Sequence, residues 1–416
     1  MDINSYQNTP LTGQKLLLRS IALFTNFLLI IVAYYQVKAA SRSLLLEYGG
    51  PDSFPYVWIG SALVLLVFIY IYQWLIKSLS RNLVVIGSLT TIMFLLVFFW
   101  FAFAMKTIFV AISFYIFVDI FSVILVEQFW SLTNAVSRTE EGHKTYWFVS
   151  SGGLVGGIAG GAVASSLVRF TPMQTEDLLL SCAITLVVTI ILTVFTSKSG
   201  LYNEVPEAET IKLSGEGFKT LINNHFLLLI AAIICLSQLV QPIVEYQFLS
   251  MVNDQISLKD KRTEFISDFF VILGFTSLAI NFSITPLVHR YLGAMAGLFV
   301  QPLILSITAL TFIYNTTLTM ASVMKVSDRG LSYSINRASK ELLYVPINPI
   351  HIYQVKAWID MLGYRLFKVI GASLILILGR YLAERNMTGL SMCTVLICLL
   401  WILVITRLTK AYKELG

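Results

Sequence analysis

The chemistry of this sequence lies in charged side chains set into an otherwise apolar chain. Residues 325–372 carry the densest group of them, between long apolar runs. Charged groups at membrane depth are costly, and the usual reason for keeping them is an ion or solute pathway. Cations in such a pathway would bind an anionic solute, while carboxylates would keep the cations charged or take up a proton. The charged residues of this segment are Lys325, Asp328, Arg329, Arg337, Lys340, Glu341, Lys356, Asp360, Arg365 and Lys368.

Three further apolar runs contain charges. Lys38 and Arg42 are four residues apart, which places them on one face of a helix. Asp119 and Glu127 lie two helical turns apart, within about 40° of one face, and Glu245 stands alone in its run. Structural interpretations stay open for each: a lysine that snorkels to the interface, an aspartate in an ion pair, or a glutamate that braces a helix kinked by a nearby proline.

We find no set of residues that would perform covalent chemistry. None of the four histidines pairs with a serine or cysteine in a recognisable motif. The glycine run 152–161 lacks the Lys-Ser or Lys-Thr ending of a phosphate loop, and small residues four apart indicate close helix packing instead. Cys393 and Cys398 do not have the spacing of a zinc site. We therefore expect no enzyme activity, no cofactor and no bound metal.

The elements that must position these charges are transmembrane helices. Of the 416 residues, 57% are hydrophobic and 12% are charged, about half the charged share of a soluble domain. Apolar runs of about 20 residues recur along the whole chain, and each is long enough to cross a bilayer. The net charge of +6 fits the basic bias of cytoplasmic loops, and no basic patch indicates nucleic-acid binding. The expected fold class is an all-α polytopic membrane protein.

We predict twelve transmembrane helices in two six-helix halves, the layout of a major-facilitator transporter. The predicted parts are an N-terminal half, 1–196, a cytoplasmic linker, 197–223, and a C-terminal half, 224–416. Lys and Arg favour one side by about two to one, which places both termini in the cytoplasm. We expect a monomer in the inner (cytoplasmic) membrane. The spans start near Leu17, Pro55, Leu83, Thr107, Tyr146, Leu178, His225, Glu264, Leu292, Leu318, Tyr353 and Leu390.

A longer pattern overlaps the charged segment. It consists of Arg329-Gly330, Tyr333-Ser334, Ala338-Ser339-Lys340, Tyr344-Val345-Pro346, Val355-Lys356, Gly363, Arg365, Lys368 and Gly371-Ala372. This pattern resembles the signature of the ATP/ADP translocases, the nucleotide transporters of obligate intracellular bacteria and of plastids. The resemblance implies that Lys340 belongs to the substrate-binding set. It also implies a basic site residue at Lys38 or Arg42, and acidic ones at Asp119 and Glu245.

The resemblance has departures. The translocases follow their Val-Glu pair with a basic Trp-Lys-Ser-Lys run, where this sequence has residues 246–249, Tyr-Gln-Phe-Leu. Fewer cations favour a less highly charged substrate. The spacing at the end of the first span differs by one residue, so either Lys38 or Arg42 is the equivalent of the substrate-contacting residue.

The sequence therefore predicts a secondary active transporter of nucleotides, by ATP/ADP-like exchange, or of related anionic metabolites, working by alternating access. The alternative is a major-facilitator-type exporter or flippase of an amphipathic cargo such as a lipid, siderophore or drug; a non-transporting scaffold is a third class. Lys340 and Glu245 are expected near mid-membrane, within reach of a shared solute or of each other. The predicted substrate-binding residues are Lys38, Arg42, Asp119, Glu245, Lys340 and Arg337.

Overall fold

The computed structural model is helical throughout the part of the chain that it describes. It describes residues 13–78, 81–137, 139–202, 215–344, 358–359, 363–381 and 386–415. Within these ranges the elements are α-helices with short 3-10 and π turns, and there is no strand. A helix satisfies its backbone hydrogen bonds within one segment, which is what lipid requires. The expected all-α class is therefore confirmed.

Ten helices of the described ranges are long and apolar enough to cross a membrane. The longest, α1 (Gln14–Gly49), has 36 residues, well beyond the roughly 20 that a bilayer requires. The predicted tenth span does form a helix from Leu318, but it is too polar to count among the ten. The predicted eleventh span starts near Tyr353, outside the described residues. A multi-pass membrane protein is confirmed, and the number twelve stays a prediction.

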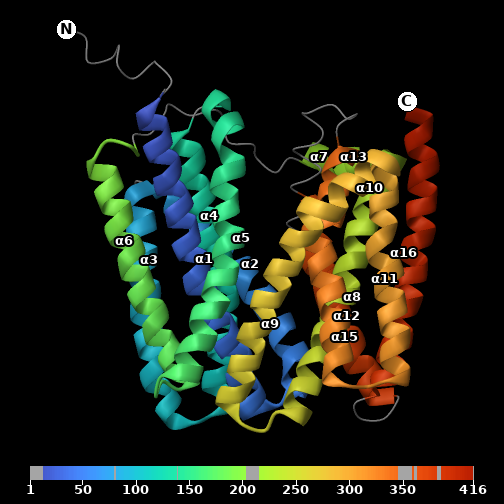
Figure 1. The fold of residues 1–416 in the computed structure, drawn as a ribbon, viewed down its shortest axis with the longest axis horizontal. Coiled ribbons are helices and arrows are strands. Elements are labelled where there is room, and N and C mark those ends of the chain that lie inside the picture. Colours follow the sequence, from blue (N-terminus) through green and yellow to red (C-terminus); the bar gives the residue numbers. More distant parts are fainter. Residues whose placement is uncertain are drawn as a thin grey trace. The chain divides into compact units, whose positions relative to one another are not determined.

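The chain forms two compact units, and the first is organised around α1. This unit contains Met1–Gly49, Leu63–Glu209 and Leu258–Gly274. Within it α1 packs against α4, α5 and α6, and α3 packs against α4 and α6 (Figure 1). The other helices are α3 (Arg81–Ala102), α4 (Ile108–Val136), α5 (Thr139–Phe170), α6 (Leu178–Lys198) and the later part of α2 (Phe54–Ser78).

The second unit is organised around α8 (His225–Gln255). It contains Gly50–Ala62, Thr210–Ser257 and Phe275–Gly416. Within it α8 packs against α12, α15 and α16, and α11 packs against α12 and α16 (Figure 1). The other helices are α7 (Gly215–Asn223), α10 (Thr285–Tyr291), α11 (Gly293–Tyr314), α12 (Leu318–Leu331), α13 (Arg337–Leu343), α15 (Tyr364–Tyr381) and α16 (Met387–Leu415).

The units divide the chain differently from the predicted halves. Helix α9 (Lys259–Ala279) begins in the first unit and continues into the second from Phe275, while residues 50–62 group with the second unit. The boundary between the two units at Glu209 and Thr210 falls inside the predicted linker, 197–223. The predicted halves, 1–196 and 224–416, therefore stay a prediction, with two short segments grouped otherwise by their contacts.

Glycines on α5 let this helix lie directly against α1. A Cβ atom at Gly152, Gly156 or Gly160 would stand 2.6, 2.7 or 2.8 Å from a carbonyl oxygen of α1. These glycines are four residues apart, so they share one helix face and allow close backbone approach. The interpretation of the glycine run as a packing surface is confirmed. The contact reaches Val32 and Tyr35 of α1, within two turns of Lys38.

We expect Gly160→Leu to destabilise the α1–α5 contact by about 1–3 kcal/mol. A Cβ there would meet the Val32 carbonyl oxygen at 2.8 Å and the Tyr35 Cβ at 2.9 Å, so the two backbones must separate. Gly87→Leu is the matched control, because a Cβ at Gly87 meets nothing within 4 Å. The melting temperature of the purified protein is the measurement. Equal melting temperatures for the two variants would contradict the packing role of Gly160.

Candidate substrate-binding residues

Lys38 lies against an aromatic cluster in the first unit, which we define as Tyr34, Tyr35, Tyr115 and Phe270. The Lys38 Nζ is 4.4 Å from the ring centroid of Tyr35, 4.5 Å from that of Phe270 and 5.2 Å from that of Tyr34. An ammonium over ring faces is attracted by the ring quadrupole, most strongly where water is excluded. The lysine side chain is half-buried. It is therefore stabilised as a cation while part of it stays accessible.

Arg42 shares this aromatic cluster with Lys38. The Arg42 guanidinium carbon is 5.5 Å from the ring centroid of Tyr115 and 5.9 Å from that of Phe270. One guanidinium nitrogen also donates to the Lys38 carbonyl oxygen at 3.1 Å, and the residue is only 9% exposed. The structure thus brings both predicted cations together. Arg42 is the more deeply buried of the two, and Phe270 contacts both.

Asp119 lies on α4, one turn after Tyr115, and so on the same helix face. Its side chain is half-buried. Within the described part of the chain its carboxylate makes no hydrogen bond or ion pair with another side chain. A carboxylate in this position can take up a proton or bind the cation of a solute.

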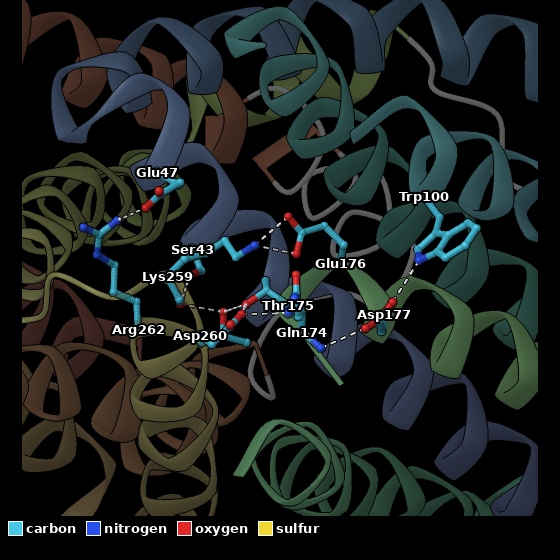
Figure 2. Close-up of polar contacts among 11 residues, drawn as sticks. Ser43, Glu47, Trp100, Gln174, Thr175, Glu176, Asp177, Lys259, Asp260 and Arg262 are labelled. Atoms are coloured by element: carbon cyan, nitrogen blue, oxygen red, sulfur yellow. Dashed lines mark hydrogen bonds and ion pairs between the residues drawn. The ribbon is translucent and has the colours of Figure 1, made fainter. Parts of the chain in front are cut away.

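Ion pairs hold the beginning of α9, the helix that carries Phe270 (Figure 2). The Lys259 ammonium is 2.6 Å from a Glu176 carboxylate oxygen, and an Arg262 guanidinium nitrogen is 3.0 Å from Glu47 at the end of α1. Hydrogen bonds in the same place join Ser43 to the Lys259 carbonyl oxygen and Thr175 to Asp260.

The end of α5 adds a third attachment to α9. The Arg169 guanidinium is 2.8 Å from Glu264 and also contacts Asp268. Gly161 on α5 faces α9. A Cβ atom at this glycine would stand 2.9 Å from the Ser267 carbonyl oxygen of α9. The first half of α9 is thereby fixed on the first unit, with Phe270 among the rings of the aromatic cluster.

Glu245, on α8 in the second unit, forms an ion pair with Lys325 of α12. The Lys325 side chain is 3% exposed and that of Glu245 is 13% exposed. The predicted partner, Lys340, lies fifteen residues beyond Lys325 in one continuous run of helix, about 22 Å along its axis. The Glu245 carboxylate thus contacts Lys325, at the other end of this run, and the expected position of Lys340 near Glu245 or a shared solute stays a prediction.

A second polar group surrounds Asp328, one turn after Lys325. The Gln301 amide nitrogen of α11 donates to the Asp328 carbonyl oxygen at 3.0 Å and lies 3.4 Å from its carboxylate. The Gln301 amide oxygen accepts from Asn336. Arg329 lies beside Asp328, with its Nε 3.6 Å from the carboxylate. The second unit therefore buries two acids and two bases close together on α8 and α12.

Lys340 and Arg337 lie on α13, after a π turn at residues Ser332–Asn336. Lys340 is half-buried and Arg337 is exposed, whereas Asn336 is buried. Burial thus differs among these neighbouring positions, and the π turn that precedes Arg337 departs from the regular α-helical period. That Lys340 and Arg337 bind substrate stays a prediction.

The positions that depart from the translocase pattern after Glu245 serve packing within the second unit. The Tyr246 hydroxyl donates to Asp52 at 2.6 Å. The Gln247 amide nitrogen donates to the Met387 carbonyl oxygen at 3.0 Å and to the Ser391 hydroxyl at 2.8 Å. Neutral side chains therefore occupy positions 246–249, where the ATP/ADP translocases have a basic run.

Comparisons with known proteins agree with this arrangement. A family model described as TLC ATP/ADP transporter matches residues 104–412. ADP,ATP carrier protein 3 of Rickettsia bellii is 23% identical over 354 residues, which are 72% of this chain and 70% of that protein. ADP,ATP carrier protein 1 of Chlamydia pneumoniae is 23% identical over 348 residues, 72% of this chain and 67% of that protein.

Two solved structures show a similar fold. A bacterial homologue of the iron transporter ferroportin, in an inward-facing state, superimposes with a TM-score of 0.69 at 16% identity, over 95% of this chain and 99% of the other. The nucleoside transporter NupG gives 0.57 at 12% identity, over 96% and 100%. These likenesses confirm the expected major-facilitator-like fold.

Proposed function

The chain belongs to the TLC ATP/ADP transporter family, and we propose that it moves nucleotides across a membrane by exchange, as a secondary transporter with alternating access. The relatives that it matches over 72% of its length are ADP,ATP carriers. The nucleotide is cargo in this proposal, and the protein is not an enzyme that hydrolyses it.

The observation that carries the proposal is the pair of cations in the aromatic cluster. Lys38 and Arg42 both stand over ring faces, and Phe270 contacts both of them. An ammonium and a guanidinium bind phosphoryl oxygens through charge-assisted hydrogen bonds, and tyrosine and phenylalanine rings stack on flat bases. One cluster thus offers both kinds of contact that a nucleotide needs.

The remaining predicted site residues take roles in this proposal by resemblance. Lys340 and Arg337 supply cations from α13, and Glu245 and Asp119 supply the carboxylates. Because Glu245 is paired with Lys325, arrival of an anionic solute can exchange one ion-pair pattern for another. Such a change in contacts gives the solute a different affinity for two conformations, which alternating access requires.

Exchange in proteoliposomes tests the proposed function. Vesicles loaded with ADP should take up labelled ATP, and vesicles without internal nucleotide should take up far less. Free phosphate should not be released during uptake, because the nucleotide crosses intact. No uptake of any nucleotide, together with no nucleotide-induced thermal shift, would contradict the proposal. Movement of a fluorescent lipid across the same vesicles would favour the amphipathic-cargo alternative.

We further propose a monomer in the inner membrane with both termini in the cytoplasm. The excess of Lys and Arg in the loops on the side of the termini supports this orientation. Cysteine labelling at each terminus, with a membrane-impermeant reagent on intact cells, tests it: neither terminus should react before the cells are opened.

A further inference from the structure

Arg329 is a buried cation of the second unit that neither the ion pair of Glu245 nor the aromatic cluster uses. It lies at the end of α12 and is 9% exposed. Arginine carries five donors in a fixed planar fork, and it is almost never fully buried unless it is paired. The partners of this guanidinium therefore decide what the residue does.

The guanidinium of Arg329 has few contacts in the described part of the chain. Its Nε stands 3.6 Å from an Asp328 carboxylate oxygen, beyond the distance of a good hydrogen bond. Its central carbon lies 5.8 Å from the ring centroid of Tyr333. Its two terminal nitrogens make no hydrogen bond to another described residue.

The charged side chains next to Arg329 already have partners. Lys325 contacts Glu245, and Gln301 occupies the backbone and one carboxylate oxygen of Asp328. Asp328 can thus offset the charge of Arg329 from the Nε side without using the terminal nitrogens. An arriving anion can bind the fork of Arg329 while this counter-ion stays in place.

The backbone next to Arg329 also departs from regular helix. The π turn Ser332–Asn336 follows directly, and π turns inside helices occur frequently at functional sites. It carries Tyr333, whose ring lies against the guanidinium. Contact with a ring face restricts the guanidinium plane, which presents the terminal nitrogens in a defined direction.

We propose that Arg329 contacts the substrate, and that its terminal nitrogens bind one phosphoryl group of the nucleotide. The planar fork of arginine matches the oxygens of a phosphoryl group, and a lysine in its place would act only as a point charge. The inference rests on the proposed function. It adds to the second unit a cation that comes from α12, in addition to Lys340 and Arg337 of α13.

Equilibrium binding to purified protein tests the inference, with ATP, ADP, AMP and adenosine as the probes. Arg329→Gln should weaken ATP and ADP binding about 10- to 100-fold, the effect of one or two charge-assisted hydrogen bonds. Adenosine binding should change less than about twofold, because adenosine has no phosphoryl group. The affinity of Arg329→Lys for ATP and ADP should lie between those of the wild type and Arg329→Gln, since lysine keeps the charge and lacks the planar fork.

Arg290→Gln is the matched control. Arg290 also lies over a ring, 5.5 Å from the centroid of Tyr291, but it is exposed. Its substitution should leave all four affinities unchanged. Melting temperatures establish that each variant is folded, and Arg329→Lys carries the comparison if Arg329→Gln does not fold.

The outcomes separate the two proposals. Wild-type protein that binds adenosine and nucleotides, with Arg329→Gln binding ADP within about threefold of it, overturns the role of Arg329 and leaves the proposed function standing. An equal loss of adenosine and ADP binding assigns Arg329 a structural role and also overturns the inference. Wild-type protein that binds none of the nucleotides overturns both.

Discussion

Lys325→Ala and Glu245→Ala are each expected to destabilise the second unit by about 3–5 kcal/mol, because each leaves a buried charge without its partner. The two side chains are in contact and are 3% and 13% exposed. Removing both charges with apolar residues of similar volume, Lys325→Met with Glu245→Leu, should cost much less than the sum of the single changes. A coupling of 0.5–3 kcal/mol or so is typical of residues in one network.

The free energy of unfolding in detergent, or the melting temperature, measures this effect. Lys261→Ala is the control, because Lys261 pairs with Glu264 on the surface and its side chain is 61% exposed; its loss should cost less than about 1 kcal/mol. The double variant should regain stability and yet fail to exchange nucleotide. A double variant as unstable as the sum of the single ones would show that the pair contributes no mutual stabilisation.

The case of Glu245 shows which part of the site can be predicted from sequence. A charge within an apolar run marks a site residue, because burial of a charge is costly. Its partner is set by the packing of α8 on α12, which a single sequence does not report. Lys325 and Lys340 lie in the same run of helix, and only Lys340 belongs to the pattern that resembles the translocase signature. Of the two, Lys325 is the one that faces α8.

The neighbours of Lys38 and Arg42 in the aromatic cluster are likewise set by helix packing and not by local sequence. Helical spacing correctly placed Lys38 and Arg42 on one face of α1, and the structure brings them together. Phe270 was not predicted as their neighbour, because phenylalanine is common in apolar runs and carries no distinguishing signal. Its position depends on the first half of α9 belonging to the first unit, where ion pairs with distant segments hold the start of this helix.

The fold class needed less information. Apolar runs of membrane length are a local property, and they predicted the helices of both units. The π turn at Ser332–Asn336, between α12 and α13, was not predicted from the sequence.

Lys38→Ala is expected to reduce nucleotide exchange about 100-fold or more while the protein stays folded. The Lys38 ammonium is half-buried among the rings of the aromatic cluster, where a charge-assisted hydrogen bond is stronger than in water. Loss of the ammonium leaves a phosphoryl oxygen without its donor. Lys38→Arg keeps a cation that stacks on the same rings, so it should retain part of the exchange activity.

Arg42 is expected to respond differently, and this difference distinguishes the two cations. Arg42 is more deeply buried and donates to the Lys38 carbonyl oxygen, so Arg42→Ala should lower the melting temperature as well as the exchange rate. Exchange by Lys38→Ala and Lys198→Ala, the latter an exposed control at the end of α6, is measured in the same vesicles. If Lys38→Ala exchanges nucleotide as fast as Lys198→Ala while Arg42→Ala is folded and inactive, then Arg42 is the substrate-contacting residue and Lys38 is the structural one.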